Sequence, residues 1–147
     1  MSALDLDHQL CFAIYSATHA FNRVYKPLLD PLGLTYPQYL VMLALWAEDD
    51  RTVGGLGEAL YLESSTLTPL LKRLEAQGLL TRTRDQADER VVRIKLTAAG
   101  KRLAAEAREI PRCMLRSSGL SLDALLRLQR EVAAVRDRLI ETAQEQA

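Results

Sequence analysis

The sequence has few of the residues from which metal and nucleophilic sites are built. Its 147 residues include only two cysteines and two histidines. Cys11 and Cys113 lie 102 positions apart, and neither histidine stands at ligand spacing from either of them. No glycine-rich phosphate loop and no catalytic-triad pattern occurs. These absences argue against a metal motif and predict a protein with no metal and no bound cofactor.

Long apolar runs are also missing. No stretch is long enough to span a membrane and no signal peptide is present, so we expect a cytoplasmic protein with reduced thiols and no membrane partner. Basic and acidic residues balance at 19 each, so no global attraction to polyanions is expected. With 48% hydrophobic residues, the chain can form one globular domain with a modest core.

The charge is nevertheless unevenly distributed along the chain. Residues 1–63 carry three basic and eight acidic side chains, a net charge of −5. Residues 64–95 carry seven and four, a net charge of +3, and residues 96–147 carry nine and seven, a net charge of +2. The excess positive charge therefore avoids the N-terminal third, as a local DNA-binding surface requires, although the effect is small.

Residues 56–80 contain two helical patterns that meet across a break. The first is short and ends near residues 61–63. The second begins at Ser64 or Ser65, where a serine is a candidate N-cap, and runs to about Gln77, before Gly78. Pro69 falls in its first turn or just beyond it, where a missing N–H costs little. The buried stripe of this second helix is Leu67, Leu70, Leu71 and Leu74.

The opposite face of the second helix suggests a function. It carries short hydroxyl groups in its N-terminal half and cations further along, which is what a helix in a DNA major groove needs. A capped, solvated amphipathic helix would show the same face. The candidate DNA-binding residues of this helix are Ser64, Ser65, Thr66, Thr68, Lys72 and Arg73.

The segment that follows predicts a β-hairpin. Its two ends, residues 79–84 and 91–96, alternate apolar and polar residues, and its middle is charged and turn-like. A helix, a turn, a recognition helix and a two-stranded ribbon together make a winged helix-turn-helix, a mainly α fold with a small β-hairpin wing. The predicted DNA contacts of the wing are Arg82, Arg84, Asp88 and Arg90.

The two arginines near the tip of the ribbon, Arg84 and Arg90, can enter a minor groove. Asp88 stands two residues before Arg90, close enough to steady its guanidinium group.

Several motifs resemble the MarR family of bacterial transcriptional regulators. The wider family is matched by the runs LLKRLE at 70–75, GLL at 78–80, DER at 88–90 and LTAAG at 96–100. Three upstream runs are more specific and resemble one branch, OhrR, the organic-hydroperoxide-sensing repressors. These are LCFAIYS at 10–16, YKPLL at 25–29 and LTYPQYLVML at 34–43.

The resemblance implies one domain over residues 1–147. Its winged helix-turn-helix lobe covers about residues 36–99, and its dimerisation helices cover about residues 1–35 and 100–147. The apolar stripe of the last predicted helix exceeds what a small winged helix can cover. A homodimer would also suit double-stranded DNA with a pseudo-palindromic operator, because two recognition helices must enter successive major grooves.

The helical patterns fix approximate boundaries outside the ribbon. One long helix is expected from about Asp7 to Leu29, with Asp5 or Asp7 as its cap. A second is expected from a Thr35 cap to about Ala47. After the wing, the pattern predicts one helix from a Thr97 cap to about Leu115, bent at Pro111, and a last helix capped by Ser121.

Cys11 lies in the first turns of the opening helix, where the helix dipole favours a thiolate. The resemblance implies that organic hydroperoxides oxidise this cysteine, that tyrosines matching Tyr25 and Tyr36 hydrogen-bond it, and that one matching Tyr15 lies nearby. Tyr25 follows Cys11 by 14 residues, which is roughly 21 Å along one helix. Any contact between them requires the partner subunit or a broken helix. A buried, inert cysteine is the alternative.

Cys113 leaves two routes open after oxidation. The resemblance implies that a second cysteine in this region resolves the Cys11 sulfenic acid as an intersubunit disulfide, whereas one-cysteine relatives form a mixed disulfide with a small thiol. The sequence does not decide between these routes.

We therefore expect a redox-sensing repressor that releases its operator when organic hydroperoxide oxidises Cys11. One alternative is a MarR-type repressor that responds to a phenolic or other small ligand, with Cys11 merely structural. Another is a thiol peroxidase, which the sequence disfavours because no general base or arginine clamp accompanies Cys11; we expect no enzyme.

Overall fold

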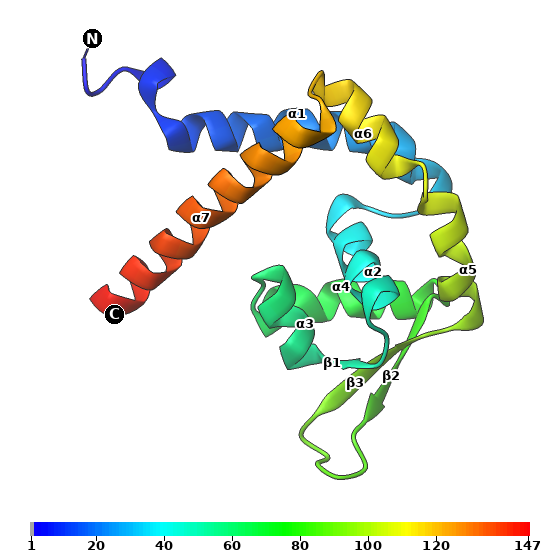
Figure 1. Ribbon diagram of the computed structural model, residues 1–147. Helices are drawn as coiled ribbons and strands as arrows, with labels where there is room; N and C mark the ends of the chain where they lie inside the picture. Colours follow the sequence, from blue (N-terminus) through cyan, green and yellow to red (C-terminus); the bar gives the residue numbers. More distant parts are fainter. Residues whose placement is uncertain (1) are drawn as a thin grey trace. The chain divides into compact units, whose positions relative to one another are not determined.

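The computed structural model describes residues 2–147, which form a larger unit up to Arg108 and a smaller unit, Glu109–Ala147 (Figure 1). The larger unit begins with a 3-10 turn, Leu6–His8, and helix α1, Leu10–Leu29. A second 3-10 turn, Asp30–Leu32, leads to α2, Tyr36–Ala47, and the two-residue strand β1, Arg51–Thr52. Next come the helices α3, Val53–Leu60, and α4, Ser64–Ala76.

The rest of the larger unit is the wing and one helix. Strand β2 covers Leu80–Arg84, strand β3 covers Val92–Leu96, and α5 covers Ala98–Ala107. The smaller unit consists of α6, Ile110–Ser118, and α7, Leu122–Gln146. None of the helices of residues 2–147 is both long enough and apolar enough to cross a membrane.

The core of the larger unit lies where α2, α3 and α4 meet the sheet. Three residues of the predicted stripe of α4, Leu67, Leu71 and Leu74, are buried, whereas Leu70 is half-buried. From the sheet, Leu80 and Ile94 are buried against them. The remaining fully buried large side chains come from α1, α2 and α3 and are Leu29, Val41, Met42, Leu45 and Leu56.

The sheet has three antiparallel strands in the order β1-β3-β2, not two as predicted. In the hairpin, Leu80 pairs with Leu96 and Arg84 pairs with Val92. The added strand places Arg51 opposite Ile94. A strand of two residues has no alternation to reveal it, so the sequence pattern missed β1.

Several predicted helix boundaries are confirmed. The Thr35 side chain accepts the backbone N–H of Gln38, whose side chain reaches back to the Thr35 N–H, a full capping box at α2. The Thr97 and Ser121 side chains cap α5 and α7 as expected. Gly78 ends α4 with a φ of 75°, a left-handed conformation that suits glycine.

Other predicted boundaries were wrong at α1 and α4. Helix α1 begins at Leu10 and not at Asp7, because Asp5 caps the preceding 3-10 turn through the Asp7 N–H. The N-cap of α4 is Glu63, which makes no side-chain cap, so the predicted serine cap is wrong. The predicted single helix from Thr97 to Leu115 is also two helices, α5 and α6. Pro111 opens α6, because its ring would clash with the Ala107 carbonyl in a continuous helix.

The smaller unit is one short and one long helix joined at Gly119, which has a φ of 71°. No residue of the 25-residue helix α7 is buried. The exposed large apolar side chains of this helix are Leu122, Leu126, Leu128, Val132, Val135 and Leu139. Helix α1 also exposes apolar side chains, among them Leu10, Ile14 and Phe21.

Candidate functional site

The two helices of the helix-turn-helix are held close by a tight turn. A Cβ on Gly57 of α3 would lie 2.7 Å from the Leu62 carbonyl oxygen, so a larger residue there would push the turn away. Tyr61 makes the turn in a left-handed conformation, with a φ of 56°. Because α4 turns its leucines inward, the predicted DNA-facing side chains lie outward. Ser64, Ser65, Thr66, Lys72 and Arg73 are exposed and Thr68 is half-buried.

Pro69 is the sixth residue of α4 and lies inside the helix, beyond its first turn. It has no N–H to donate to the Ser65 carbonyl four residues earlier. That carbonyl lies on the first turn of the recognition helix, next to the exposed hydroxyl groups.

The wing presents two arginines near its tip. The Arg90 side chain is 90% exposed and its Nε lies 3.1 Å from Asp88 Oδ1, which is the contact predicted from the sequence. The pKa of Asp88 is lowered, chiefly by this hydrogen bond from Arg90. Arg84 is exposed and donates to the Glu89 carbonyl at 2.9 Å. Both guanidinium groups are therefore steadied by the loop while still facing solvent.

Arg82 has a different environment from the other wing arginines. It pairs with the buried Ile94 across the hairpin and lies on the same face of the sheet. Its Nη2 lies 3.1 Å from Glu75 Oε1, and its backbone N–H donates to Glu75 Oε2 at 3.1 Å. Glu75 therefore fastens β2 to the C-terminal half of α4. The sequence predicts a DNA contact for Arg82, and within the chain its guanidinium group is held by Glu75.

A groove joins the recognition helix to the wing. Its volume is about 500 Å³. Ser64 and Thr68 of α4 line it together with Arg82 and Arg90 of the wing. The fold thus places hydroxyl groups and guanidinium groups from two elements around one opening, as a surface for a nucleic-acid backbone requires.

Cys11 is the second residue of α1 and is exposed, so the buried, inert alternative does not describe it in the single chain. Tyr15 follows one helical turn later and is also exposed, with its ring edge-on to His19 at 4.6 Å between centroids. Because α1 is unbroken from Leu10 to Leu29, Cys11 and Tyr25 are separated by roughly 21 Å along the helix. The chain does not bring them together by itself.

Tyr25 and Tyr36 meet each other instead. Their ring centroids are 4.7 Å apart, and Tyr39, which the sequence reasoning did not select, completes the group at 5.8 Å from Tyr25. Tyr39 recurs three residues after Tyr36 on α2, which is the signal that could have identified it. Burial, with smaller contributions from the other two phenols, raises the pKa of Tyr25 to about 12. Burial also raises the pKa of Tyr36.

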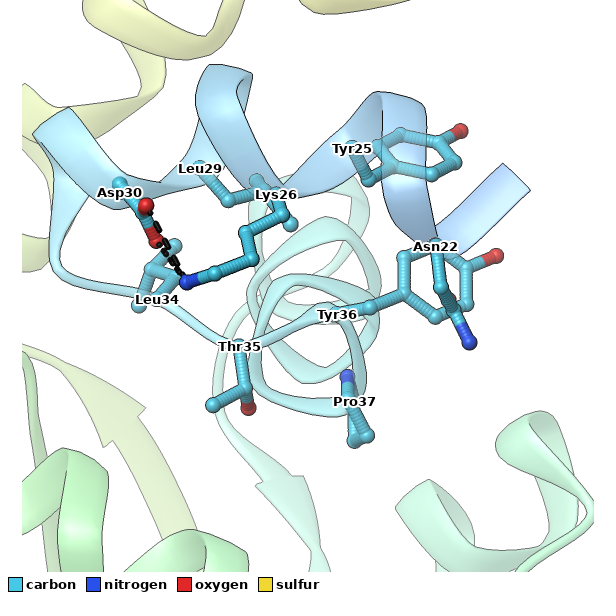
Figure 2. Close-up of a pocket in the computed structure, with 9 residues that line it drawn as sticks. All are labelled: Asn22, Tyr25, Lys26, Leu29, Asp30, Leu34, Thr35, Tyr36 and Pro37. Carbon is cyan, nitrogen blue, oxygen red and sulfur yellow. Dashed lines mark hydrogen bonds and ion pairs between the residues drawn. The ribbon is translucent and has the colours of Figure 1, made fainter. Parts of the chain in front are cut away.

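The tyrosines border a groove of about 310 Å³ between α1 and the start of α2. Figure 2 shows the Tyr25 and Tyr36 rings projecting to the same side, with Lys26 paired to Asp30 at the other end of the groove. A neighbouring hollow of about 240 Å³ shares Asn22, Tyr25 and Tyr36 and adds Thr18 and Phe21. Among residues 2–147, neither hydroxyl group takes part in a hydrogen bond, so both can serve a group from outside the chain.

Cys113 lies in the smaller unit, on α6, and is half-buried. The Arg116 guanidinium donates to its sulfur at 3.6 Å. In residues 2–147, no group of three or more histidine, cysteine or carboxylate side chains could hold a metal ion.

Comparison with known proteins places this arrangement in a family. The family model described as "Transcriptional regulator SarA/Rot" matches residues 23–107. The chain is 49% identical over 134 residues to the HTH-type transcriptional regulator TtmR of Methylorubrum extorquens, covering 91% of the chain and 69% of TtmR. It is 48% identical over 126 residues to the organic hydroperoxide resistance transcriptional regulator of Bacillus subtilis, covering 86% of each.

Solved structures that resemble this chain point to the same family as the sequence relatives. The overoxidised AbfR bound to DNA superposes with a TM-score of 0.77 at 38% identity, covering 92% of this chain and 94% of AbfR. AbfR, a protein of Staphylococcus epidermidis, is also known in a reduced, DNA-bound form and in a disulfide form. These relatives are transcriptional regulators and not enzymes, which removes the thiol peroxidase alternative. The chain belongs to the MarR family of winged-helix transcriptional regulators and matches its SarA/Rot type.

Proposed function

We propose that this chain acts in the cytoplasm as a homodimeric repressor that releases a pseudo-palindromic operator when an organic hydroperoxide oxidises Cys11. The observation that carries the proposal is an exposed cysteine at the start of α1 in a chain 48% identical to an organic hydroperoxide resistance regulator. The exposed apolar side chains of α1 and α7 support a dimer, because a lone chain would leave them in water.

The first chemical step consumes one hydroperoxide. The Cys11 thiolate attacks the outer oxygen of ROOH, the O–O bond breaks, and the products are Cys11–SOH and an alkoxide that takes a proton to become ROH. The sulfur is oxidised and the hydroperoxide is reduced. In the second step a thiol attacks the sulfenic sulfur, so that a disulfide forms and water leaves. That thiol is either Cys113 of the partner subunit or a small cellular thiol.

The tyrosine pair supports the first step. Because the pKa of Tyr25 is about 12, its phenol stays protonated at physiological pH and can donate a hydrogen bond to a thiolate without adding negative charge. Helix continuity keeps Tyr25 away from Cys11 of its own chain. In the proposed dimer, Tyr25 and Tyr36 therefore serve Cys11 of the partner subunit, and Tyr15 lies one turn from Cys11 on the same helix.

DNA recognition is divided between two elements in this proposal. The α4 residues Ser64, Ser65, Thr66 and Thr68 face base edges and phosphates in the major groove, and Lys72 and Arg73 contact phosphate or guanine. Arg84 and Arg90 enter the minor groove from the wing, with Asp88 orienting Arg90. Arg82 supports the wing from inside through Glu75.

Operator binding by mobility shift tests the proposal. DNA selected by the reduced wild-type protein from a random duplex pool serves as the probe, and wild type is compared with Cys11→Ser before and after cumene hydroperoxide and then dithiothreitol. We expect only wild type to release DNA and reductant to restore binding. Release by both proteins, or by neither, refutes Cys11 as the switch.

The same samples separate the two resolving routes. Wild type and Cys113→Ser are run on non-reducing gels after one equivalent of hydroperoxide, with and without glutathione. A covalent dimer that disappears in Cys113→Ser identifies Cys113 as the resolving thiol. A monomer whose mass, measured by mass spectrometry, increases by that of one glutathione identifies the small-thiol route.

The groove beside the tyrosines supports a second candidate, a regulator that responds to a small phenolic ligand. Its volume of about 310 Å³ and its mixture of apolar and hydroxyl-bearing side chains suit such a ligand. This candidate predicts that Cys11→Ser still binds operator and that a phenol, not a hydroperoxide, releases it.

A further inference from the structure

Two consecutive aspartates in the turn between α2 and β1 hold the base of the wing. Asp50 Oδ1 lies 2.8 Å from Arg93 Nε, and the Asp50 carbonyl accepts a second hydrogen bond from Arg93 at 2.8 Å. Asp49 Oδ1 accepts the backbone N–H of Leu96 at 2.8 Å. Arg93 and Leu96 belong to β3, so both contacts join the turn to the central strand of the sheet.

Further cations of the wing and of α5 gather on the same turn. Lys95 of β3 lies 3.7 Å from Asp50 Oδ2, and Lys101 of α5 lies 4.0 Å from Asp49 Oδ2. Arg93 also reaches Asp85, at the end of the opposite strand, at 3.4 Å. Arg93 thereby connects the turn, β3 and the start of the wing loop, and that loop carries Arg90.

The backbone of Asp50 has a conformation that few residue types adopt. Its φ is 56°, in the left-handed region that residues other than glycine rarely adopt, although aspartate and asparagine tolerate it best. In this conformation Asp50 offers both its carboxylate and its carbonyl oxygen to one guanidinium group. The pKa of Asp50 is lowered, with the hydrogen bond from Arg93 as the largest cause.

We propose that Asp50 is a positioning residue for DNA binding, which fixes the wing through Arg93 so that Arg90 is held ready for the minor groove. Asp50 itself need not touch DNA. The inference rests on the proposed DNA-binding role of the wing and adds to it the element that sets the wing's orientation. A freely hinged wing would lose conformational freedom on binding, and a fixed wing loses less.

Whether a substitution of Asp50 weakens or strengthens DNA binding separates this positioning role from a simple electrostatic effect. Asp50→Asn removes a negative charge close to the DNA-binding surface, which on charge alone strengthens binding to a polyanion. Asparagine keeps the left-handed conformation and the carbonyl contact, so the substitution chiefly weakens the ion pair. Positioning predicts the opposite, weaker binding. We expect a loss of roughly three- to thirty-fold, because surface ion-pair networks contribute modestly and a dimer has two wings.

The experiment compares wild type, Asp50→Asn and a matched control, using DNA selected by wild type as the probe. The control is Asp137→Asn on α7 of the smaller unit, which disrupts another Arg–Asp pair at 2.8 Å. Hydroxyl-radical footprinting reports where contact is lost. Weaker binding by Asp50→Asn, with protection lost only in the minor groove next to the site and binding by the control unchanged or tighter, supports the proposal.

Equal or tighter binding by Asp50→Asn overturns it, as does a loss of protection spread evenly over the site. Hydrogen exchange of the free protein supplies a readout that needs no DNA. We expect faster exchange of wing amides at residues 92–96 in Asp50→Asn, and unchanged exchange also overturns the proposal. If wild type selects no DNA sequence, the proposed function fails, and the exchange result alone then decides whether Asp50 positions the wing.

Discussion

Alanine at position 100 should destabilise the larger unit through a contact with backbone. Gly100 is the third residue of α5 and is buried. A Cβ built there would overlap the Leu79 carbonyl oxygen and lie 3.2 Å from Leu96 Cδ2. The Leu79 carbonyl cannot move aside freely, because it accepts the Thr97 N–H at 3.1 Å. Helix α5 must therefore shift away from the start of β2.

The magnitude follows from two opposing effects. Overpacking a well-packed site costs about 1–3 kcal/mol, and a clash with backbone belongs at the upper end of that range. Replacing glycine by alanine within a helix raises the free energy of unfolding by about 1 kcal/mol, because alanine has the higher helix propensity. The net expected loss is about 2 kcal/mol of unfolding free energy, or a Tm lower by about 4–8 °C for a chain of this size.

Urea unfolding followed by tryptophan fluorescence measures this change. Trp46 is the single tryptophan, and its Nε1 donates to the Gly100 carbonyl at 2.9 Å, so the probe reports on the same corner. Protein concentrations must match, because the proposed dimer would add to the apparent stability. Gly54→Ala in α3 is the control, since a Cβ there meets nothing within 4 Å. The free energy of unfolding of Gly54→Ala should increase by up to about 1 kcal/mol.

The reasoning is refuted if Gly100→Ala is as stable as wild type or gains stability as Gly54→Ala does. Either result would mean that α5 can move without cost. A loss of similar size in both variants would also refute it, because the open position has no neighbour to clash with.

Four further substitutions test the wing, the tyrosine group and the cap of α2. Arg90→Ala should weaken operator binding and lower its salt dependence, whereas Arg82→Ala should mainly lower the urea midpoint, because Arg82 is paired with Glu75. Tyr25 has a folded-state pKa of about 12 against an ordinary 10.0, so its contribution to stability is complete below pH ~10 and is lost as the pH rises towards ~12. Tyr25→Phe should therefore flatten the alkaline part of a stability-versus-pH curve. Thr35→Ala should cost about 1 kcal/mol in thermal unfolding, because it removes the capping box of α2.

Much of the fold could be predicted from local chemistry. The leucine stripe and Gly78 located α4 because helix periodicity and a left-handed C-terminal glycine are local signals. Thr35 and Thr97 likewise marked helix starts through their own side chains. The error at Pro111, where one bent helix was predicted and two helices are present, shows the limit of local sequence signals. A proline after a long apolar pattern fits both a bend within a helix and the start of a new helix.

The candidate site was less accessible to sequence reasoning. The sequence alone does not distinguish the three arginines of the hairpin, Arg82, Arg84 and Arg90. In the structure, Arg82 differs from the other two because it lies on the inward face of the sheet and contacts Glu75. The contact between Asp50 and Arg93 spans 43 positions and depends on a strand too short to show a pattern. Long-range ion pairs leave no periodic signal, so the support of the wing could not be predicted.

The unbroken length of α1 has a consequence for inheritance. If each sensor in the proposed dimer combines Cys11 of one chain with Tyr25 of the other, an allele defective in Tyr25 impairs the thiol of its companion and leaves its own untouched. Two alleles that each fail alone, one lacking Cys11 and the other lacking Tyr25, would retain one complete sensor in every mixed dimer. Intragenic complementation between these alleles would follow from the length of a single unbroken helix.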